Sequence, residues 1–357
     1  MPTPPLTLAE KMIVVRAFVE FREKAAAAQS LDMPGSTFDH RLSAAVPSRD
    51  LLDAKAWLDE HQTETVQRDG FRYDAPVNVE EDVGERWERR RKVFRKRRAA
   101  QEARTWMPFR MDRVEPCALL WFGDPHLDDD GCDFDALDRA ITVARMPGVY
   151  SVGIGDYQNN WIGRLARLYG SQETSHKQAW QDVKHFVQNQ GINWLTLLKG
   201  NHDQWSGAGD PLDYIAEGYS DVAEWRSQFR LVWDNGVELK IDAAHDHKGN
   251  SQYSESFGAK KAAYFDGRAD IYVCGHKHSF SLDRFIQPHR GTMHEAFRVR
   301  GFKYFDMHAL VNGFPEMIGA EAMLTVIDPR DGLYFQTFDD LGKGVTFLRC
   351  LKMEMAA

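Results

Sequence analysis

The chain has 357 residues, a net charge of −8, and hydrophobic and charged contents of 43% and 27%, which indicates a soluble protein of two or three domains with ample core. No apolar run approaches membrane-spanning length, no secretory leader is apparent, and the acidic balance excludes a uniformly basic nucleic-acid coat. The four cysteines form no CxxC pair, and Cys117 and Cys274 lie in apolar runs, so we expect free thiols and a cytoplasmic location.

Residues 1–60 are expected to form a small all-helical domain. Thr7 can cap a helix over 8–25, an Ala-rich stretch and a turn follow, and a second helix begins near Ser36 or Thr37. This pattern resembles a helix-turn-helix of the homeodomain-like or resolvase-like kind, and DNA binding is the favoured interpretation. A helical hairpin used for packing or self-association is the alternative. On or near the recognition helix would be Ser36, Thr37, Asp39, His40 and Arg41.

Residues 61–105 are expected to form a linker and a basic helix. The stretch 61–84 is polar, with Gly70, Pro76 and an acidic run, which is typical of a linker. Residues 85–100 favour helix and carry basic side chains around most of its surface, so the helix would repel itself unless anions lie against it. It would contact a phosphate backbone or, alternatively, be a solvated connector that pairs with acidic surface elsewhere. The predicted nucleic-acid contacts are Arg41, Arg89, Arg90, Arg91, Arg97 and Arg98.

The remainder, residues 106–357, alternates apolar runs with amphipathic stretches and is typical of an α/β domain. We expect strands over 117–122, 149–154, 192–198, 229–233, 237–243 and 270–274, with β-like runs at 324–327, 334–337 and 345–351. Helices are expected over 134–144, 173–188, 221–228 and 255–264.

A polar motif follows five of these strands. The motif residues are Asp124 and His126, then Asp156, then Asn201 with His202 and Asp203, then His245, and finally His276 with His278. Each motif alone could be a capping Asp, a satisfied histidine or a turn. Together they recur every 30 to 45 residues at the carboxyl ends of strands, where open α/β sheets place their chemistry.

This motif set resembles that of the calcineurin-like metallophosphoesterases, with the motifs covering residues 115–280. The resemblance implies a four-layer αββα sandwich, in which two packed mixed β-sheets are flanked by helices. It also implies two divalent metal ions bridged by Asp156, while His202 faces the substrate and Asp203 orients it. By position, the other ligands would be Asp124, His126 and His278 for one ion, and Asn201, His245 and His276 for the second.

Two positions leave alternatives open within this resemblance. After Asp156 the chain offers Asn159 and Asn160 where many members of the family carry another Asp or Asn, so auxiliary contacts there are not assigned. His245 and His247 are both candidates in the fourth motif. We favour His245 because it is nearer the strand end.

The residue types also support two-metal chemistry independently. Two divalent ions bring four positive charges, against which the protein sets only the carboxylates of Asp124 and Asp156, so the site attracts a phosphate anion. A His/Asp/Asn shell suits Mn, with Fe, Zn or Ni as alternatives, better than Ca. His202 can protonate the leaving oxygen or stabilise its charge.

We therefore expect a metal-dependent hydrolase, specifically a nuclease or phosphodiesterase. The helical module and the basic helix favour nucleic acid, and DNA above RNA, as its partner, and no membrane partner is expected. A phosphomonoesterase or a cyclic-nucleotide phosphodiesterase is the alternative among enzymes. A DNA-binding scaffold with a vestigial enzyme domain is the alternative from another class, and the intact ligand set argues against it.

Overall fold

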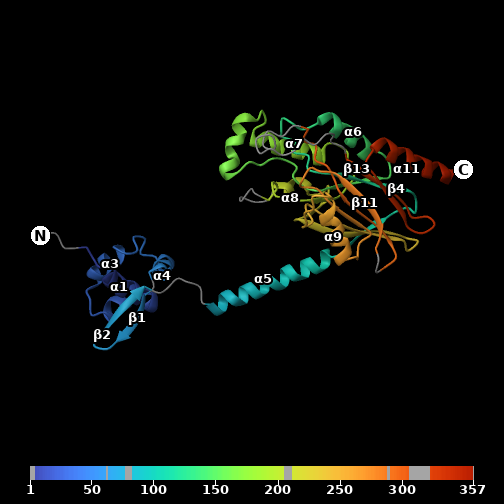
Figure 1. Cartoon of the computed structure of the whole chain (residues 1–357). Helices are drawn as coiled ribbons and strands as arrows, with labels where there is room; N and C mark the ends of the chain where they lie inside the picture. The colour runs from blue at the N-terminus through green and yellow to red at the C-terminus, as the bar shows by residue number, and fades with distance from the viewer. Residues whose placement is uncertain are drawn as a thin grey trace. The chain divides into compact units, whose positions relative to one another are not determined.

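A computed structural model describes residues 5–61, 63–76, 83–204, 211–287, 290–304 and 322–356 (Figure 1). The chain divides into two compact units, Met1–Phe94 and Arg95–Ala357, and helix α5 (Val83–Arg104) contributes residues to both. Within the described part of the chain, no helix is long and apolar enough to cross a membrane.

Among the described residues of the first unit, four helices that precede α5 surround a small apolar core. They are α1 (Leu8–Phe21), α2 (Lys24–Ser30), α3 (Gly35–Ser43) and α4 (Leu51–Glu60). Thr7 caps α1 as predicted, but Arg22 adopts a left-handed conformation and ends that helix, so the single helix predicted over 8–25 is two. Phe38 and Leu42 of α3 are buried in the core. The predicted recognition residues lie on α3, and DNA binding by this helix stays a prediction.

A β-hairpin occupies part of the predicted linker, so the first unit is not all-helical. Strands β1 (Thr63–Arg68) and β2 (Phe71–Pro76) pair antiparallel, with Arg68 opposite Phe71. Asp69 and Gly70 form the turn, and the φ of Gly70 is +88°, a conformation that glycine adopts without steric cost. An Asp-Gly pair between two strands is a common hairpin signal, so the linker prediction is wrong over these residues.

The part of the second unit that the structure describes contains two six-stranded mixed sheets. The strands of the first sheet are β4 (Cys117–Phe122), β5 (Val149–Gly153), β6 (Trp194–Leu198), β7 (Asp221–Ala223), β13 (Met323–Asp328) and β14 (Tyr334–Phe338). Those of the second are β3 (Met107–Met111), β8 (Arg226–Trp233), β9 (Glu238–Ala244), β10 (Ile271–Cys274), β11 (Ser281–Ile286) and β12 (Met293–Arg298). Their spatial orders are β14-β13-β4-β5-β6-β7 and β11-β12-β10-β9-β8-β3. Strands β4, β5 and β6 are parallel, and so are β9 and β10.

One apolar core joins the two sheets, and helices cover their other faces. Trp121 and Val152 of the first sheet share a buried cluster with Phe229 and Phe297 of the second. Helices α6 (Phe134–Ala144), α7 (His176–Gln188), α8 (Pro211–Ala216) and α11 (Leu341–Ala356) pack on the first sheet, and α9 (Phe257–Phe265) packs on the second. A 3-10 helix, η1 (Gly163–Ser171), precedes α7. The arrangement is compatible with the predicted sandwich.

Two of the predicted elements have the wrong type. Residues 221–228 form β7 and the start of β8 rather than a helix, and β8 buries every second side chain, including Phe229 and Leu231. Residues 345–351 lie in helix α11 rather than a strand. Leu341, Val345 and Leu348 are buried there, at the spacing of one helix face. Strands β3, β11 and β12 are additions to the predicted set.

Candidate metal centre

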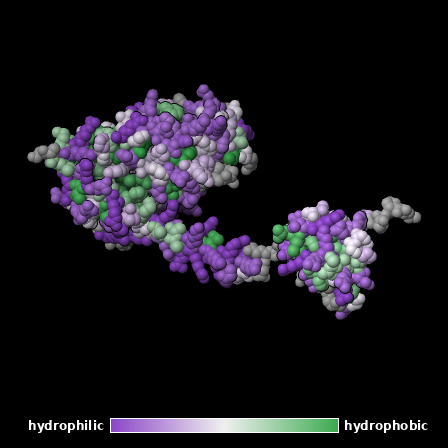
Figure 2. Space-filling model, turned by 180° about the vertical axis from the view of Figure 1, so that it is seen from behind, coloured by the Kyte–Doolittle hydropathy of each residue, from purple (hydrophilic) through white to green (hydrophobic). Residues whose placement is uncertain are grey.

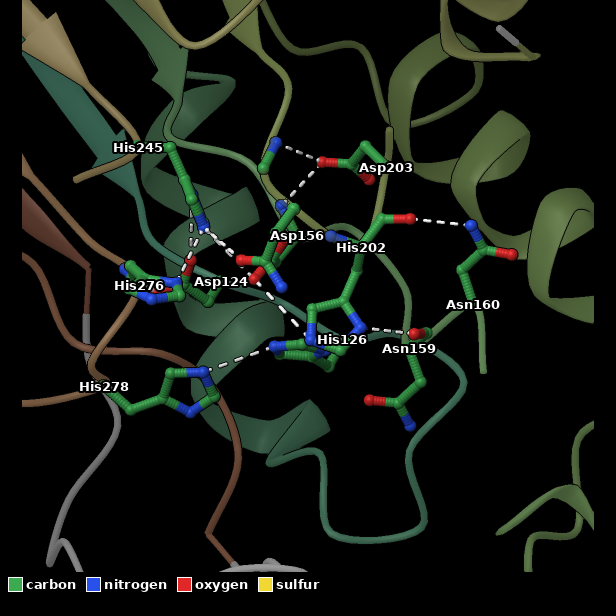
Figure 3. A network of polar contacts seen from close by, with 12 residues as sticks. Asp124, His126, Asp156, Asn159, Asn160, His202, Asp203, His245, His276 and His278 are labelled. Atoms are coloured by element: carbon green, nitrogen blue, oxygen red, sulfur yellow. Dashed lines mark hydrogen bonds and ion pairs between the residues drawn. The ribbon is translucent and has the colours of Figure 1, made fainter. Parts of the chain in front are cut away.

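The loops that follow β4, β5, β6, β9 and β10 meet at one place (Figure 3). Three of these strands belong to the first sheet and two to the second, so the site lies where the carboxyl ends of strands from both sheets come together. The structure brings all seven predicted metal ligands into this cluster, namely Asp124, His126, Asp156, Asn201, His245, His276 and His278.

Asp156 belongs to two groups of side chains that could hold a metal ion. Asp156, His245 and His276 each offer an atom within 4.8 Å of the others, and so do Asp156, His126 and His202. His245 Nε2 lies 3.2 Å from Asp156 Oδ2 and 3.1 Å from His276 Nδ1. Asn201 Oδ1 is 3.1 Å from the same His245 nitrogen. One carboxylate shared by two groups is the geometry expected of a bridging ligand.

The atoms around Asp124 fit a cation. His126 Nε2 and His278 Nε2 face each other 3.2 Å apart. Asp124 Oδ2 accepts the His276 N–H at 2.7 Å, and Asp124 Oδ1 lies 3.5 Å from His245 Nδ1. Asp124 Oδ1 and His126 Nδ1 are buried without a hydrogen-bond partner among the described residues. A buried carboxylate oxygen normally has a partner, and a divalent cation would supply one, since His and Asp are common metal ligands.

The charges in the cluster also favour a cation. Burial works to lower the pKa of His245, but the carboxylates of Asp156 and Asp124 outweigh it and raise that pKa to about 9. Burial works to raise the pKa of Asp156. The charge of His245 and the hydrogen bonds that Asp156 accepts outweigh burial and hold that pKa below its usual value. Burial lowers the pKa of both His126 and His276, which keeps their rings neutral, the form that binds metal.

The backbone of the cluster is strained where it presents these side chains. The angle φ is 43° at His126, 53° at Asp156, 70° at His276 and 53° at His278. Such left-handed residues cost on the order of 1–3 kcal/mol each and gather at functional sites. Gly200 provides a close approach, because a Cβ there would lie 2.1 Å from Asp156 Oδ1. The loops therefore adopt strained conformations that place the ligand atoms of these side chains in the cluster.

The carboxylate of Asp203, which the resemblance predicts to orient His202, is occupied by backbone N–H groups. It accepts backbone N–H groups from Asp156 and Gly200, both at 2.7 Å, and from Tyr157 at 3.2 Å. Asp203 thus ties the loop after β5 to the loop after β6. His202 is oriented by the carbonyl oxygen of Asn159, which its Nδ1 contacts at short range. With Nδ1 as the donor, the lone pair of Nε2 is available 4.0 Å from Asp156 Oδ2.

A buried polar network behind His202 supplies residues that sequence reasoning missed. Asp128 Oδ1 accepts the backbone N–H of Asn159 at 2.7 Å, and Asn159 Nδ2 donates to Asp129 Oδ2 at 2.8 Å. Asn160 Nδ2 donates to the carbonyl oxygen of His202 at 2.7 Å. Asn159 and Asn160, to which the sequence assigns no role, therefore position His202. Asp128 follows the predicted ligand His126 by two residues. That proximity in the sequence is a signal that could mark Asp128 as part of the site.

His247 does not join the cluster, and the predicted nucleic-acid contacts belong to helices α3 and α5. His247 Nε2 lies 3.4 Å from the carbonyl oxygen of Asp242, so it is His245 that occupies the cluster. Arg41 lies on α3. Helix α5 buries none of its residues, and its visible surface is mostly hydrophilic (Figure 2). It carries the other predicted nucleic-acid contacts, Arg89, Arg90, Arg91, Arg97 and Arg98.

No family profile and no curated protein matches the chain. Among solved structures that match, one is described as GAP50, the anchor in the inner membrane complex of Plasmodium. The similarity has a TM-score of 0.35 and 11% sequence identity, and it covers 66% of this chain and 95% of that chain. A TM-score this low says nothing about function. The function is therefore inferred from the side chains of the cluster alone.

Proposed function

We propose that the second unit is a dinuclear, metal-dependent phosphoesterase of the calcineurin-like class. The observation that supports this most is that Asp156 belongs to both groups of potential metal ligands. Asp124, His126 and His278 would hold one ion, and Asn201, His245 and His276 the second, with Mn favoured and Fe, Zn or Ni as alternatives. Such ions, when bound, supply a water nucleophile of lowered pKa and positive charge for the phosphate.

The protein's own contribution to the reaction centres on His202. The Asn159 carbonyl fixes the ring, and Asn160 holds the backbone of the same residue. The ring is therefore held in one orientation, in which Nε2, once protonated, would donate to the leaving oxygen. Asp203 keeps Asp156 and the loop of His202 in register through three backbone hydrogen bonds.

Metal reconstitution tests this proposal. Protein stripped by a chelator and reloaded with Mn should take up close to two equivalents and hydrolyse bis-p-nitrophenyl phosphate faster than p-nitrophenyl phosphate. Faster hydrolysis of the monoester would instead assign a phosphomonoesterase. Activity that resists chelation, or protein that neither takes up metal nor cleaves either ester, would overturn the proposal and favour the scaffold alternative.

We propose further that the substrate is nucleic acid, with DNA favoured. Helix α5 carries ten basic and three acidic residues over Val83–Arg104, whereas the whole chain has a net charge of −8. Acidic residues of the same helix pair with part of this charge, as in Arg91–Glu88 and Arg98–Glu102. Three acidic residues cannot balance ten basic ones, and a helix with this excess of positive charge favours a polyanion such as a phosphate backbone.

Neutralising part of α5 should weaken nucleic-acid binding and flatten its salt dependence. The variant changes Arg89, Arg90, Arg91, Arg97 and Arg98 to Gln in the full-length chain. For duplex DNA, the slope of log affinity against log salt should fall by about 0.9 for every phosphate that the variant no longer neutralises. The ratio of DNA cleavage to bis-p-nitrophenyl phosphate hydrolysis should fall as well. Binding titrations at two salt concentrations and the two rates are the measurements.

A control variant removes the same charge elsewhere. It changes to Gln five exposed basic residues of the second unit, Arg113, Lys177, Lys184, Lys343 and Arg349. If both variants lose affinity equally, net charge rather than α5 is responsible. If the α5 variant aggregates or changes mass in light scattering while each folded molecule keeps its affinity, the helix is a structural or oligomer contact and the proposal fails.

A further inference from the structure

Trp225 lies beside the metal centre with part of its indole open to solvent. Its ring packs edge-to-face on His245, with centroids 4.9 Å apart at 83°, and lies 6.3 Å from the ring of His276. These two histidines form a group with Asp156. Trp225 nevertheless remains 37% exposed. A large apolar ring is thus presented next to the proposed position of the phosphate.

Hydrogen bonds to the ring and the backbone hold Trp225 in place. Its Nε1–H donates to the carbonyl oxygen of Asp246 at 3.1 Å. Its own carbonyl oxygen accepts the N–H of His245 at 2.8 Å. Trp225 also directly precedes β8, which begins at Arg226. A ring fixed this way loses little conformational entropy when a ligand stacks on it, which is the condition for a preorganised binding surface.

Trp161, another indole near the cluster, is already engaged by the protein. Its ring lies 5.4 Å from that of His202, and Lys303 Nζ lies over it at 5.4 Å. Its Nε1–H donates to Gln172 Oε1 at 3.0 Å. These contacts account for Trp161 as a packing residue. Trp225, by contrast, contacts the rings of two metal ligands and keeps exposed surface for a bound molecule.

We propose that Trp225 stacks on the base adjacent to the cleaved phosphate, so that the site takes a nucleotide or an unpaired nucleic-acid strand. The proposal rests on the phosphoesterase function and specifies its substrate class. A base lies one sugar away from its phosphate, so a phosphate held at the cluster brings the base to the neighbouring ring. Bases within a duplex stack on each other, whereas an unpaired base has a free face. Stacking accepts every base, so little sequence preference is expected.

Two diesters with the same leaving group test this directly. Thymidine 5′-p-nitrophenyl phosphate carries a base, and methyl p-nitrophenyl phosphate does not. We expect the Mn-loaded full-length protein to prefer the thymidine ester in kcat/KM, mainly through KM. Trp225→Ala should reduce that preference by about 5- to 150-fold, the range expected for losing one base–aromatic stack, and Trp225→Phe should restore part of it. Using a ratio removes any loss shared by both esters, and Phe265→Ala, at a ring that is 83% exposed, is the matched control.

Binding measurements separate this proposal from the phosphoesterase function. The probes are the phosphonate analogue of thymidine 5′-monophosphate and methylphosphonate, neither of which has an ester to hydrolyse. Tighter binding of the thymidine analogue that depends on Trp225 supports stacking even if no ester is cleaved. Equal hydrolysis and equal binding of the two members of each pair would overturn the stacking proposal while leaving the phosphoesterase intact. Stacking is also refuted if Trp225→Ala lowers kcat/KM equally for both esters, since Trp225 would then only pack against His245.

Discussion

Asp156→Asn should abolish metal binding and lower turnover by roughly 10³-fold or more, because one substitution removes the carboxylate charge shared by both ligand groups. Asn keeps the shape of the side chain. Its oxygen can still accept the backbone N–H of His202, which Asp156 Oδ1 accepts at 2.9 Å. The fold should therefore survive. Metal analysis after Mn loading and the rate on bis-p-nitrophenyl phosphate are the primary measurements.

Thermal denaturation provides a readout of the same variant that does not depend on activity. A metal that binds only the folded protein raises its melting temperature, so Mn should stabilise the wild type and leave Asp156→Asn unchanged. Asp270→Asn is the matched control. Asp270 accepts the Lys240 N–H at 2.8 Å and lies at the opposite end of β10 from His276. An Asp156→Asn protein that retained two equivalents of metal and normal turnover would refute the bridging role.

His202→Ala should retain its metal and lose turnover by about 10²–10⁴-fold, the usual contribution of a positioned acid or base. The Nδ1 contact with the Asn159 carbonyl leaves Nε2 as the functional atom. In the proposed mechanism, the group removed is the proton carrier that would face the leaving oxygen. Metal content and kcat on a chromogenic diester, measured on the same preparation, distinguish this role from simple loss of the site.

The geometry also allows a competing role for His202, that of a metal ligand. Its ring offers an atom within 4.8 Å of atoms of His126 and Asp156, so Nε2 could ligate an ion. In that case His202→Ala would release one equivalent of metal, and added Mn would rescue part of the activity. Asn160→Ala is a useful companion, because Asn160 supports the backbone of His202 at 2.7 Å without offering an atom to the cluster. It should lower kcat moderately and leave the metal in place.

The sequence predicts most of the strands that carry the site, because the signal there is local. An apolar run followed by a glycine and then by Asp or His marks the carboxyl ends of β4, β5 and β10 without any tertiary information. Helix α11 is wrongly predicted as a strand because Val345, Thr346 and Phe347 favour strands individually. Its burial at Leu341, Val345 and Leu348 is helical, and packing on the first sheet decides its conformation.

The partners of the cluster residues could not be predicted in the same way. Asp203 binds three N–H groups from two loops, one of which leaves a different strand, and backbone donors leave no mark in a sequence. The orientation of His202 likewise depends on a carbonyl oxygen, that of Asn159. Residue types indicate which side chains can ligate a metal. Which backbone atoms hold those side chains follows only from the tertiary structure.

The left-handed backbone at His126, Asp156, His276 and His278 limits how this chain can evolve toward heat resistance. Glycine would relieve each of these conformations, but at every one of the four positions it would delete a donor atom of the cluster. At these four positions a stabilising exchange would therefore also remove a proposed metal ligand. Selection for thermal tolerance is left with the core between the sheets and with the covering helices, where side chains can change without loss of a ligand.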